Sequence, residues 1–256
     1  MMRVLKFVGL ILFVLGELIA FSLQIDAQET SPHWSYGGEA NPTHWGRLGN
    51  DFASCEVGRD QSPIDIDDAV VGSPPAIEFN YSSVPLVVVN NGHTIQVNYA
   101  EGSTVRIGGD EYDLLQFHFH TPSEHTAAGH ASAMELHLVH RNEAGELAVV
   151  GILLEQGSGH PVIETVWEHI PTEVGMNEVA SVAISASDLL PESIAYFSYT
   201  GSLTTPPCSE GVRWVVMKEP VEVSEEQIAA FEGLYQVNAR PTQPTNGRII
   251  ELHDEE

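Results

Sequence analysis

Two short segments of alternating side chains constrain the fold and the function of this chain more than any other feature. Residues 116–120 read QFHFH, and residues 134–140 read MELHLVH. Side chains two positions apart lie on the same face of a β-strand, so His118 and His120 share a face. If the two segments pair as neighbouring strands, His137 points to the same place. Three imidazoles then converge, and a fourth coordination position stays open.

Three histidine ligands with one open position are typical of a catalytic zinc site, whereas a structural zinc site is closed by four protein ligands. Structural sites also use several Cys as a rule, and this chain has only two. A metal-bound His normally donates its other ring N–H to an acceptor. Gln116 stands two positions before His118, and Glu135 stands two positions before His137. The sequence therefore predicts a Zn2+ cofactor, with an acceptor beside two of its ligands.

The same histidines allow two other interpretations. They can be ordinary polar residues of a solvated sheet face, which suits a lone His better than an H-x-H and an E-x-H with polar neighbours. The spacing of His118, His120 and Glu124 also matches part of the cupin metal motif, in which the Glu is a ligand. That motif needs glycines where this chain has Tyr112 and Ala131, so the sequence disfavours it.

The histidine segments resemble the zinc site of the α-class carbonic anhydrases. The resemblance extends over residues 34–248, nearly the whole chain after its N-terminal segment, and rests on the motifs QFHFH (116–120), SEH (123–125), ELHLVH (135–140), QSPIDI (61–66), NNGH (90–93) and SLTTPPC (202–208). Many short alternating segments already favour a mainly β fold. The resemblance implies a single domain with a large, twisted, mostly antiparallel central sheet and a few short peripheral helices.

The resemblance also implies a reaction, the reversible hydration of carbon dioxide to bicarbonate and a proton by attack of zinc-bound hydroxide. It assigns His93 as the proton shuttle, and a solvent-accessible His with a pKa of about 6.5 suits that role. It assigns Thr204 to accept a hydrogen bond from the hydroxide and to donate one to Glu124. An ionised carboxylate can only accept, which agrees with this direction.

Further site residues follow from the same resemblance. An uncharged, nonpolar substrate needs an apolar wall, and the family builds this wall from matching residues. The predicted pocket residues are Val139, Val149, Leu203, Thr205, Trp214 and Gln96. Tyr36 is expected near the site without touching the substrate, while His125, His130 and His140 are interpreted as structural.

The N-terminus predicts export. A short basic region, an apolar run and a small residue near Ala27 are typical of a signal peptide, here residues 1–27, followed by the domain at 28–256. Glu17 interrupts the apolar run, which disfavours but does not remove an uncleaved N-terminal anchor. An even number of Cys in an exported chain favours a disulfide between Cys55 and Cys208 over two buried thiols. The family resemblance implies the same bridge, in a periplasmic or extracellular protein.

Charge limits the possible partners. The chain has 36 acidic and 10 basic residues, for a net charge of −26, which disfavours nucleic acid and anionic membranes. The acidic surface is either an ordinary solvated one or an adaptation to a saline medium. The expected partners are carbon dioxide and bicarbonate, with the chain a monomer or a homodimer. A family member without catalysis that only binds, and a small-ester hydrolase, are the competing functions.

Overall fold

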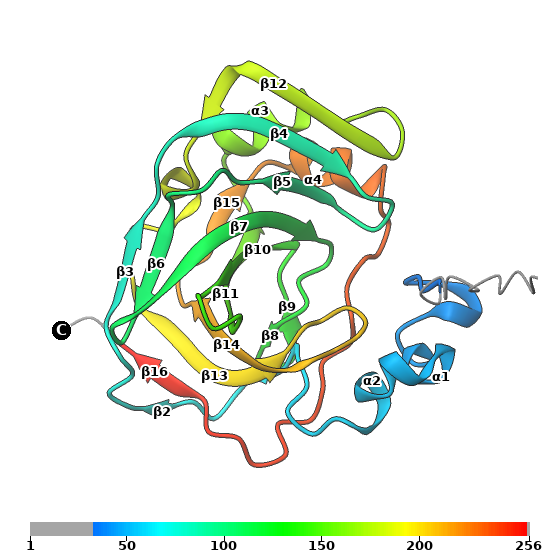
Figure 1. The fold of residues 1–256 in the computed structure, drawn as a ribbon, viewed down its shortest axis with the longest axis vertical. Coiled ribbons are helices and arrows are strands. Elements are labelled where there is room, and N and C mark those ends of the chain that lie inside the picture. Colours follow the sequence, from blue (N-terminus) through cyan, green and yellow to red (C-terminus); the bar gives the residue numbers. More distant parts are fainter. Residues whose placement is uncertain (1–32, 255–256) are drawn as a thin grey trace, which may run out of the picture. The chain divides into compact units, whose positions relative to one another are not determined.

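The computed structural model describes residues 33–254, and in this part of the chain β-strands dominate (Figure 1). This confirms the mainly β prediction. The strands are β1 Asp65–Ile66, β2 Val70–Val71, β3 Ile77–Asn80, β4 Val84–Asn90, β5 Ile95–Asn98, β6 Thr104–Ile107, β7 Asp110–His120, β8 Thr126–Ala127, β9 His130–Ala131, β10 Met134–Arg141, β11 Leu147–Gln156, β12 Gly175–Ile184, β13 Tyr196–Ser202, β14 Glu210–Met217, β15 Val221–Val223 and β16 Glu251–His253.

Thirteen of these strands form one sheet, with the main order β12-β4-β5-β7-β10-β11-β14-β13-β16-β2. The other three of the thirteen, β3, β6 and β15, pair along its flanks, while β1, β8 and β9 make a separate small sheet. Most pairs are antiparallel, as predicted, but β11–β14, β11–β15 and β16–β2 are parallel. The two histidine strands, β7 and β10, lie side by side in the middle of the large sheet (Figure 1).

The alternation seen in the sequence separates the two faces of these strands. Phe117 and Phe119 of β7 are fully buried in the larger apolar core, together with Leu136 and Leu138 of β10. The histidines between them therefore point to the opposite face. Burial of these four large apolar side chains, where β7 pairs with β10, contributes roughly 1.5–3 kcal/mol each. A shift of the pairing by one residue would turn them to the other face, so their burial fixes the register of the histidines.

Few helices are present in residues 33–254, and all are short. They are α1 Trp45–Leu48, α2 Ser54–Val57, α3 Pro161–Trp167 and α4 Glu225–Glu232, with single 3-10 turns at Gly38–Ala40, Asn50–Phe52 and Ala186–Leu189. Helix α4 begins with a capping box, in which the Ser224 hydroxyl accepts from the backbone N–H of Gln227. Trp167 of α3 and Phe231 of α4 stack on each other and cover Phe119 from the core side.

Cys55 and Cys208 form the predicted disulfide, with an S–S distance of 2.03 Å. The bridge joins α2 to the loop between β13 and β14, which is the SLTTPPC segment.

Residues 1–27, the predicted signal peptide, lie outside the described residues, so that prediction and the domain boundary at 28 stay untested. Within the described part of the chain, no helix is long and apolar enough to cross a membrane.

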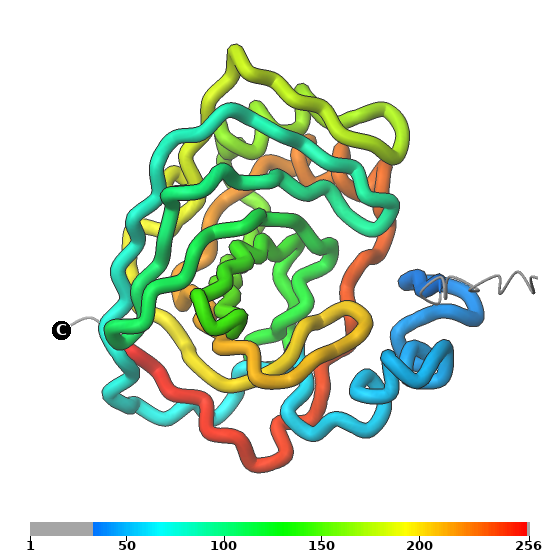
Figure 2. The backbone as a smooth tube through the Cα atoms, in the orientation of Figure 1, coloured from blue at the N-terminus to red at the C-terminus, as the bar shows by residue number. Residues whose placement is uncertain are grey.

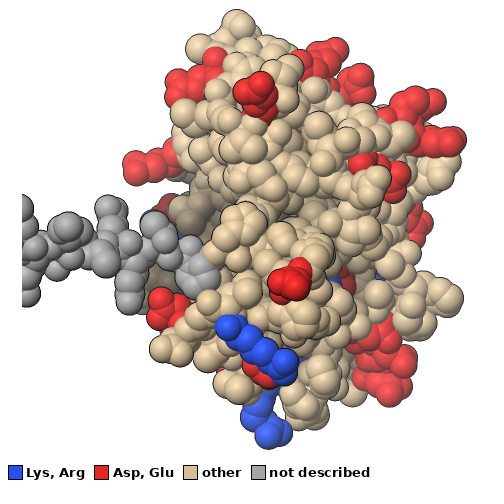
Figure 3. Space-filling view, turned by 90° about the vertical axis from the view of Figure 1, so that its right-hand side faces the viewer, with Lys and Arg blue, Asp and Glu red and all other residues tan. Residues whose placement is uncertain are grey.

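Acidic side chains dominate the charged surface on the face drawn in Figure 3, where basic side chains are few. Several of the basic residues are paired with acidic ones, as Arg106 is with Glu111 at 2.9 Å and Lys218 with Asp254 at 2.8 Å. Such exposed pairs contribute little to stability. The excess negative charge therefore stays largely uncompensated by the protein and faces solvent.

Candidate metal centre

The three predicted ligands converge on one point of the sheet. In the antiparallel pairing of β7 with β10, His137 lies directly opposite His118, and His120 follows on the same face. Ligand nitrogens of the three residues lie within 4.8 Å of one another. Adjacent strands and period-two alternation are sufficient to produce this geometry, as the sequence predicted.

Each ring is held by the nitrogen that faces away from the convergence point. The acceptors are oxygens that cannot donate, so the histidine must donate in each case. The three hydrogen bonds run from His118 Nδ1 to Gln116 Oε1 at 2.9 Å, from His120 Nδ1 to the backbone carbonyl of Asn238 at 2.7 Å, and from His137 Nε2 to Glu135 Oε1 at 2.8 Å. His118 and His120 thus offer Nε2 and His137 offers Nδ1, each as a lone pair.

The donor set fits a metal ion. His120 Nε2 is buried and has no hydrogen-bond partner among the described residues, which is costly for a polar atom unless a ligand occupies the place. Burial lowers the pKa of His120 to about 4, and burial together with the neighbouring His120 and His137 lowers the pKa of His118 well below its usual value. The imidazoles are therefore neutral near pH 7, which is the form that binds metal.

Glu135 organises the site from behind. Its Oε1 accepts from His137 and from His125 Nδ1 at 2.7 Å, and its Oε2 accepts from the backbone N–H groups of Glu124 and His125, each at 2.8 Å. Burial raises the pKa of Glu135, but His125 and His137 outweigh burial and hold that pKa well below its usual value. His125, interpreted from sequence as structural, also bonds the Tyr199 hydroxyl at 2.7 Å through Nε2.

His125, Glu135 and His137 also lie close enough together to hold a metal in principle. The direct nitrogen–oxygen distances of 2.7 and 2.8 Å are hydrogen bonds, and they leave no room for an ion between the atoms. This second group therefore orients His137, which is a ligand of the first group, and is not a second metal site. Glu124 is not among the candidate ligands, which disagrees with the cupin interpretation.

Glu124 and Thr204 are buried beside the histidines. Glu124 Oε1 accepts from the backbone N–H of Arg240 at 2.8 Å, while Oε2 has no hydrogen bond of normal geometry within residues 33–254. The Thr204 hydroxyl nevertheless lies close enough to this carboxylate to lower its pKa. Burial raises the pKa of Glu124 to about 7, and His137, the Arg240 N–H and Thr204 oppose that rise.

His93 sits in the turn between β4 and β5, at the rim of the site. Its ring stacks on Trp34, with centroids 3.9 Å apart and planes 12° from parallel. Partial burial and nearby His33 lower the pKa of His93 below its ordinary value. Tyr36 lies inward of this stack, where burial and the charge of Glu124 raise its pKa well above the usual value. Its ring meets that of Trp34 edge-on, with centroids 5.5 Å apart, and its role at the site stays a prediction.

The predicted apolar wall forms from three neighbouring strands. Val139 of β10 pairs with Val149 of β11, which in turn pairs with Trp214 of β14, so the three lie in one row across the sheet. Together with Leu203 they belong to an apolar cluster separate from the larger core. This row is adjacent to the row that contains His137, and it extends the site with a nonpolar surface.

Two further predicted pocket residues lie at the edges of the site. Gln96 of β5 pairs directly with His118 of β7, and its side chain donates to Asn98 Oδ1 at 2.6 Å. Thr205 follows Thr204 in the loop and is half-buried. Gln96 is therefore close to a metal ligand in the sheet, whereas Thr205 is placed only by its neighbour Thr204.

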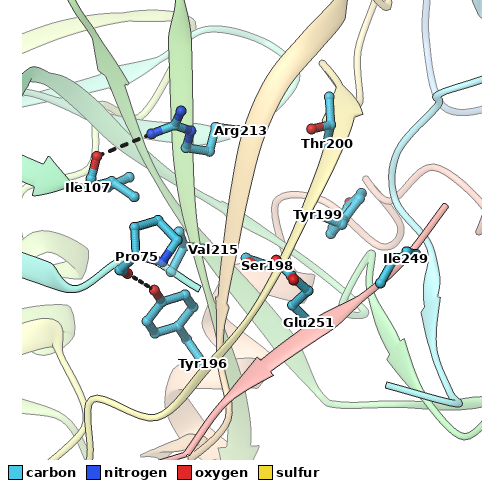
Figure 4. A pocket seen from close by; sticks show the side chains of 10 residues that line it. All are labelled: Pro75, Ile107, Tyr196, Ser198, Tyr199, Thr200, Arg213, Val215, Ile249 and Glu251. Atoms are coloured by element: carbon cyan, nitrogen blue, oxygen red, sulfur yellow. Dashed lines mark hydrogen bonds between the residues drawn. The ribbon is translucent and has the colours of Figure 1, made fainter. Parts of the chain in front are cut away.

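A second feature is a cavity of about 400 Å³ whose lining is drawn in Figure 4 and includes none of the three candidate ligands. Side chains of Ser198, Arg213 and Val215 line it, together with Tyr199, whose hydroxyl bonds His125. In the same cavity Tyr196 donates to the backbone carbonyl of Pro75 (Figure 4). Because no metal ligand lines it, this cavity is not part of the candidate centre.

Fold and site together define a class of protein: a mainly β protein in whose large sheet three neutral histidines, close enough to hold a metal ion, lie beside an apolar cluster. A family model described as eukaryotic-type carbonic anhydrase matches residues 40–254. The chain belongs to the eukaryotic-type, or α-class, carbonic anhydrase family. Carbonic anhydrases are enzymes, and the family supports the hydration of carbon dioxide as the reaction of this chain.

Individual relatives match this chain over most of its length. The carbonic anhydrase of Nostoc sp. is 42% identical over 254 residues, which cover 97% of this chain and 96% of the relative. A hyperthermostable carbonic anhydrase from a hydrothermal vent chimney superposes with a TM-score of 0.84 at 47% identity, over 87% of this chain and 100% of the other. The α-carbonic anhydrase of Thermovibrio ammonificans, solved with the inhibitor sulfanilamide, gives 0.84 at 43% identity with the same coverages.

Proposed function

We propose that this protein is an exported, zinc-dependent carbonic anhydrase that interconverts carbon dioxide and water with bicarbonate and a proton. The observation that carries the proposal is the convergence of three neutral histidines beside an apolar wall, one of them with a buried Nε2 that has no hydrogen-bond partner within residues 33–254. A disulfide-bonded, strongly acidic chain is compatible with a location outside the cytoplasm, periplasmic or extracellular.

His118, His120 and His137 would hold the zinc ion. Zinc, when bound, supplies a Lewis acid that lowers the pKa of water to about 7, and carbonic anhydrase is itself the reference case for that value. Zinc suits the donor set because three neutral imidazoles with an open fourth position match its catalytic sites. Gln116, Glu135 and the Asn238 carbonyl would fix the ring orientations that this set requires.

Other residues of the chain bind and orient the reactants. The wall of Val139, Val149, Leu203 and Trp214 accepts an uncharged substrate without a competing polar partner. Glu124, when ionised, can only accept, so it directs the Thr204 hydroxyl proton toward itself. The Thr204 oxygen would then accept a hydrogen bond from the O–H of the attacking water, which orients the lone pair of the water oxygen toward the substrate carbon.

His93 would carry the product proton from the site to bulk water. Its rim position and its depressed pKa keep the ring neutral, and so able to accept a proton, at neutral pH. The stack with Trp34 holds the ring at the outer end of the turn. Export of the proton is required in each turnover, because the hydrated product releases one.

The test of this proposal is stopped-flow hydration of carbon dioxide by the purified mature protein, before and after chelation and after zinc restoration. We expect activity that disappears with the metal and returns with one zinc per chain. Zinc bound at one per chain without activity would indicate a binding protein instead. Absence of both metal and activity would mean that the histidines do not form a metal site.

Replacing His93 with Ala should lower turnover in buffers of poor proton-accepting capacity by about 100-fold, the lower end of the range for proton-transfer groups. Small imidazole buffers should restore part of that loss, because they replace the missing ring. His130→Ala, at an exposed position in β9, serves as the matched control and should behave like the parent. Full turnover of the His93 variant without added imidazole would remove His93 from the mechanism.

A further inference from the structure

The backbone carbonyl of Phe119, between the two histidine ligands of β7, accepts two hydrogen bonds from outside its strand. Thr94 donates through Oγ1 at 2.5 Å, and Asn238 donates through Nδ2 at 2.9 Å. Thr94 belongs to the same turn as His93, while Asn238 comes from the segment after α4. Figure 2 shows this segment in orange-red as it passes the end of the turn and of β7.

Asn238 uses every polar atom of its side chain at this junction. Its Nδ2 also donates to the backbone carbonyl of His93 at 3.1 Å, and its Oδ1 accepts from the backbone N–H of Thr121 at 2.7 Å. The residue is fully buried. One amide group therefore ties the backbone of His93 to the strand that carries His118 and His120.

Other contacts shape the turn without fixing it to β7. Asn91 Oδ1 accepts from the backbone N–H groups of His93 and Thr94, each at 2.9 Å, which are bonds within the turn. The Tyr235 hydroxyl donates to Asn90 Oδ1 at 2.5 Å, which connects the start of the turn to the segment after α4 but not to β7. Beyond the pairing of β5 with β7, which begins at Gln96, the turn is therefore linked to the ligand strand through Phe119, whose backbone N–H also donates to Thr94 Oγ1 at 3.3 Å.

We propose that Thr94 and Asn238 form a clamp that fixes the position of His93 relative to the metal ligands, and that both are positioning residues for proton transfer. The inference rests on the proposed function and deepens it. A proton carrier depends on a constant gap to the group it serves, and a misplacement of 1 Å can cost a large factor in rate. With the backbone fastened, the position of the His93 ring depends only on its own side-chain torsions and on the Trp34 stack.

The clamp predicts a specific kinetic pattern in Thr94→Val, which removes the hydroxyl and keeps the shape. Turnover without a proton-accepting buffer should fall by about tenfold, less than the full penalty of a 1 Å misplacement, and imidazole should restore it. Thr94→Ser, which keeps the hydroxyl, should stay near the parent. The rate of zinc loss to a chelator should stay unchanged in both variants, because Thr94 bonds only backbone atoms and no ligand side chain.

Asn238→Ala tests the other half of the clamp, with Asn177→Ala as the matched control, since Asn177 also donates an amide N–H to a backbone carbonyl, that of His169 at 3.0 Å. The Asn238 variant should show the same fall in turnover, which imidazole restores. Zinc should dissociate faster from this variant if its backbone carbonyl moves away from His120. Adding either clamp substitution to His93→Ala should give no further imidazole-sensitive loss. If Asn238→Ala does not fold, the comparison of Thr94→Val with Thr94→Ser still tests the clamp.

Two results would overturn the clamp: parent-like turnover of Thr94→Val in both buffers, or a loss that imidazole does not change. A His93→Ala variant without buffer dependence would overturn it as well, while the zinc-dependent hydration by the parent would still stand. A parent protein that binds zinc but does not hydrate carbon dioxide would instead contradict the proposed function. The two failures are therefore distinguishable in one set of measurements.

Discussion

Replacing His137 with Ala is expected to abolish both metal retention and carbon dioxide hydration. Two nitrogens would remain of the three that converge within 4.8 Å, and water would occupy the vacated position. Glu135 would also lose one of its four hydrogen bonds and keep its charge in a buried place. Metal content after dialysis and stopped-flow rates measure the two losses, and we expect activity at the uncatalysed background.

His140→Ala is the matched control for this prediction. His140 lies on the same strand and is equally buried, but it bonds the Tyr81 hydroxyl at 2.8 Å in the larger core instead of facing the metal centre. Its removal should reduce stability by roughly 1–3 kcal/mol and leave zinc bound. If His137→Ala kept its zinc, or if His140→Ala lost it, the assignment of the ligand set would be wrong.

Replacing Glu135 with Ala should have the largest effect on stability. The substitution leaves four buried donors, two from His125 and one each from Glu124 and His137, without their acceptor. Removing one partner of a buried charged network costs roughly 3–5 kcal/mol. Zinc affinity should fall by about 10- to 100-fold, as it does when the hydrogen-bond partner of a ligand is lost. Urea unfolding and competition with a chelator measure the two quantities.

Glu135→Gln should be intermediate, because the amide keeps an accepting oxygen but turns a donor toward the N–H groups that Oε2 now serves. Glu178→Ala, at an exposed position of β12, should change stability by less than about 0.5 kcal/mol. Equal zinc affinity of the Glu135→Ala variant and the parent would show that Glu135 does not orient His137.

The parts of the site that the sequence predicted are local. His118, His120 and His137 follow from alternation within two strands that are close in the chain, and the same alternation buries Phe117 and Phe119 on the other side. The order of the strands could not be predicted in this way. The pairing that brings Trp214 beside Val149 joins segments that are far apart in the chain, and such pairing leaves no local periodic signal. Its position in the pocket came only from the resemblance to the family.

The contributions missed from sequence are mostly made by backbone atoms. Asn238 supports His120 with its carbonyl, and Arg240 supports Glu124 with its N–H, so residue identity carries no signal for either role. His125 was interpreted as structural, and the only hint of its bond to Glu135 was its place beside Glu124 in the SEH segment. An irregular segment such as 233–250 has no period from which such contacts can be predicted.

The parallel pairing of β16 with β2 joins two parts of the chain that are far apart in sequence. Such non-local contacts are slow to form, because a long loop must close before the pairing stabilises it. The metal ligands lie on locally paired strands and can meet early, whereas the acceptor for His120 arrives with the segment after α4. Folding should therefore produce the three histidines before it produces a site that holds them in the right orientation.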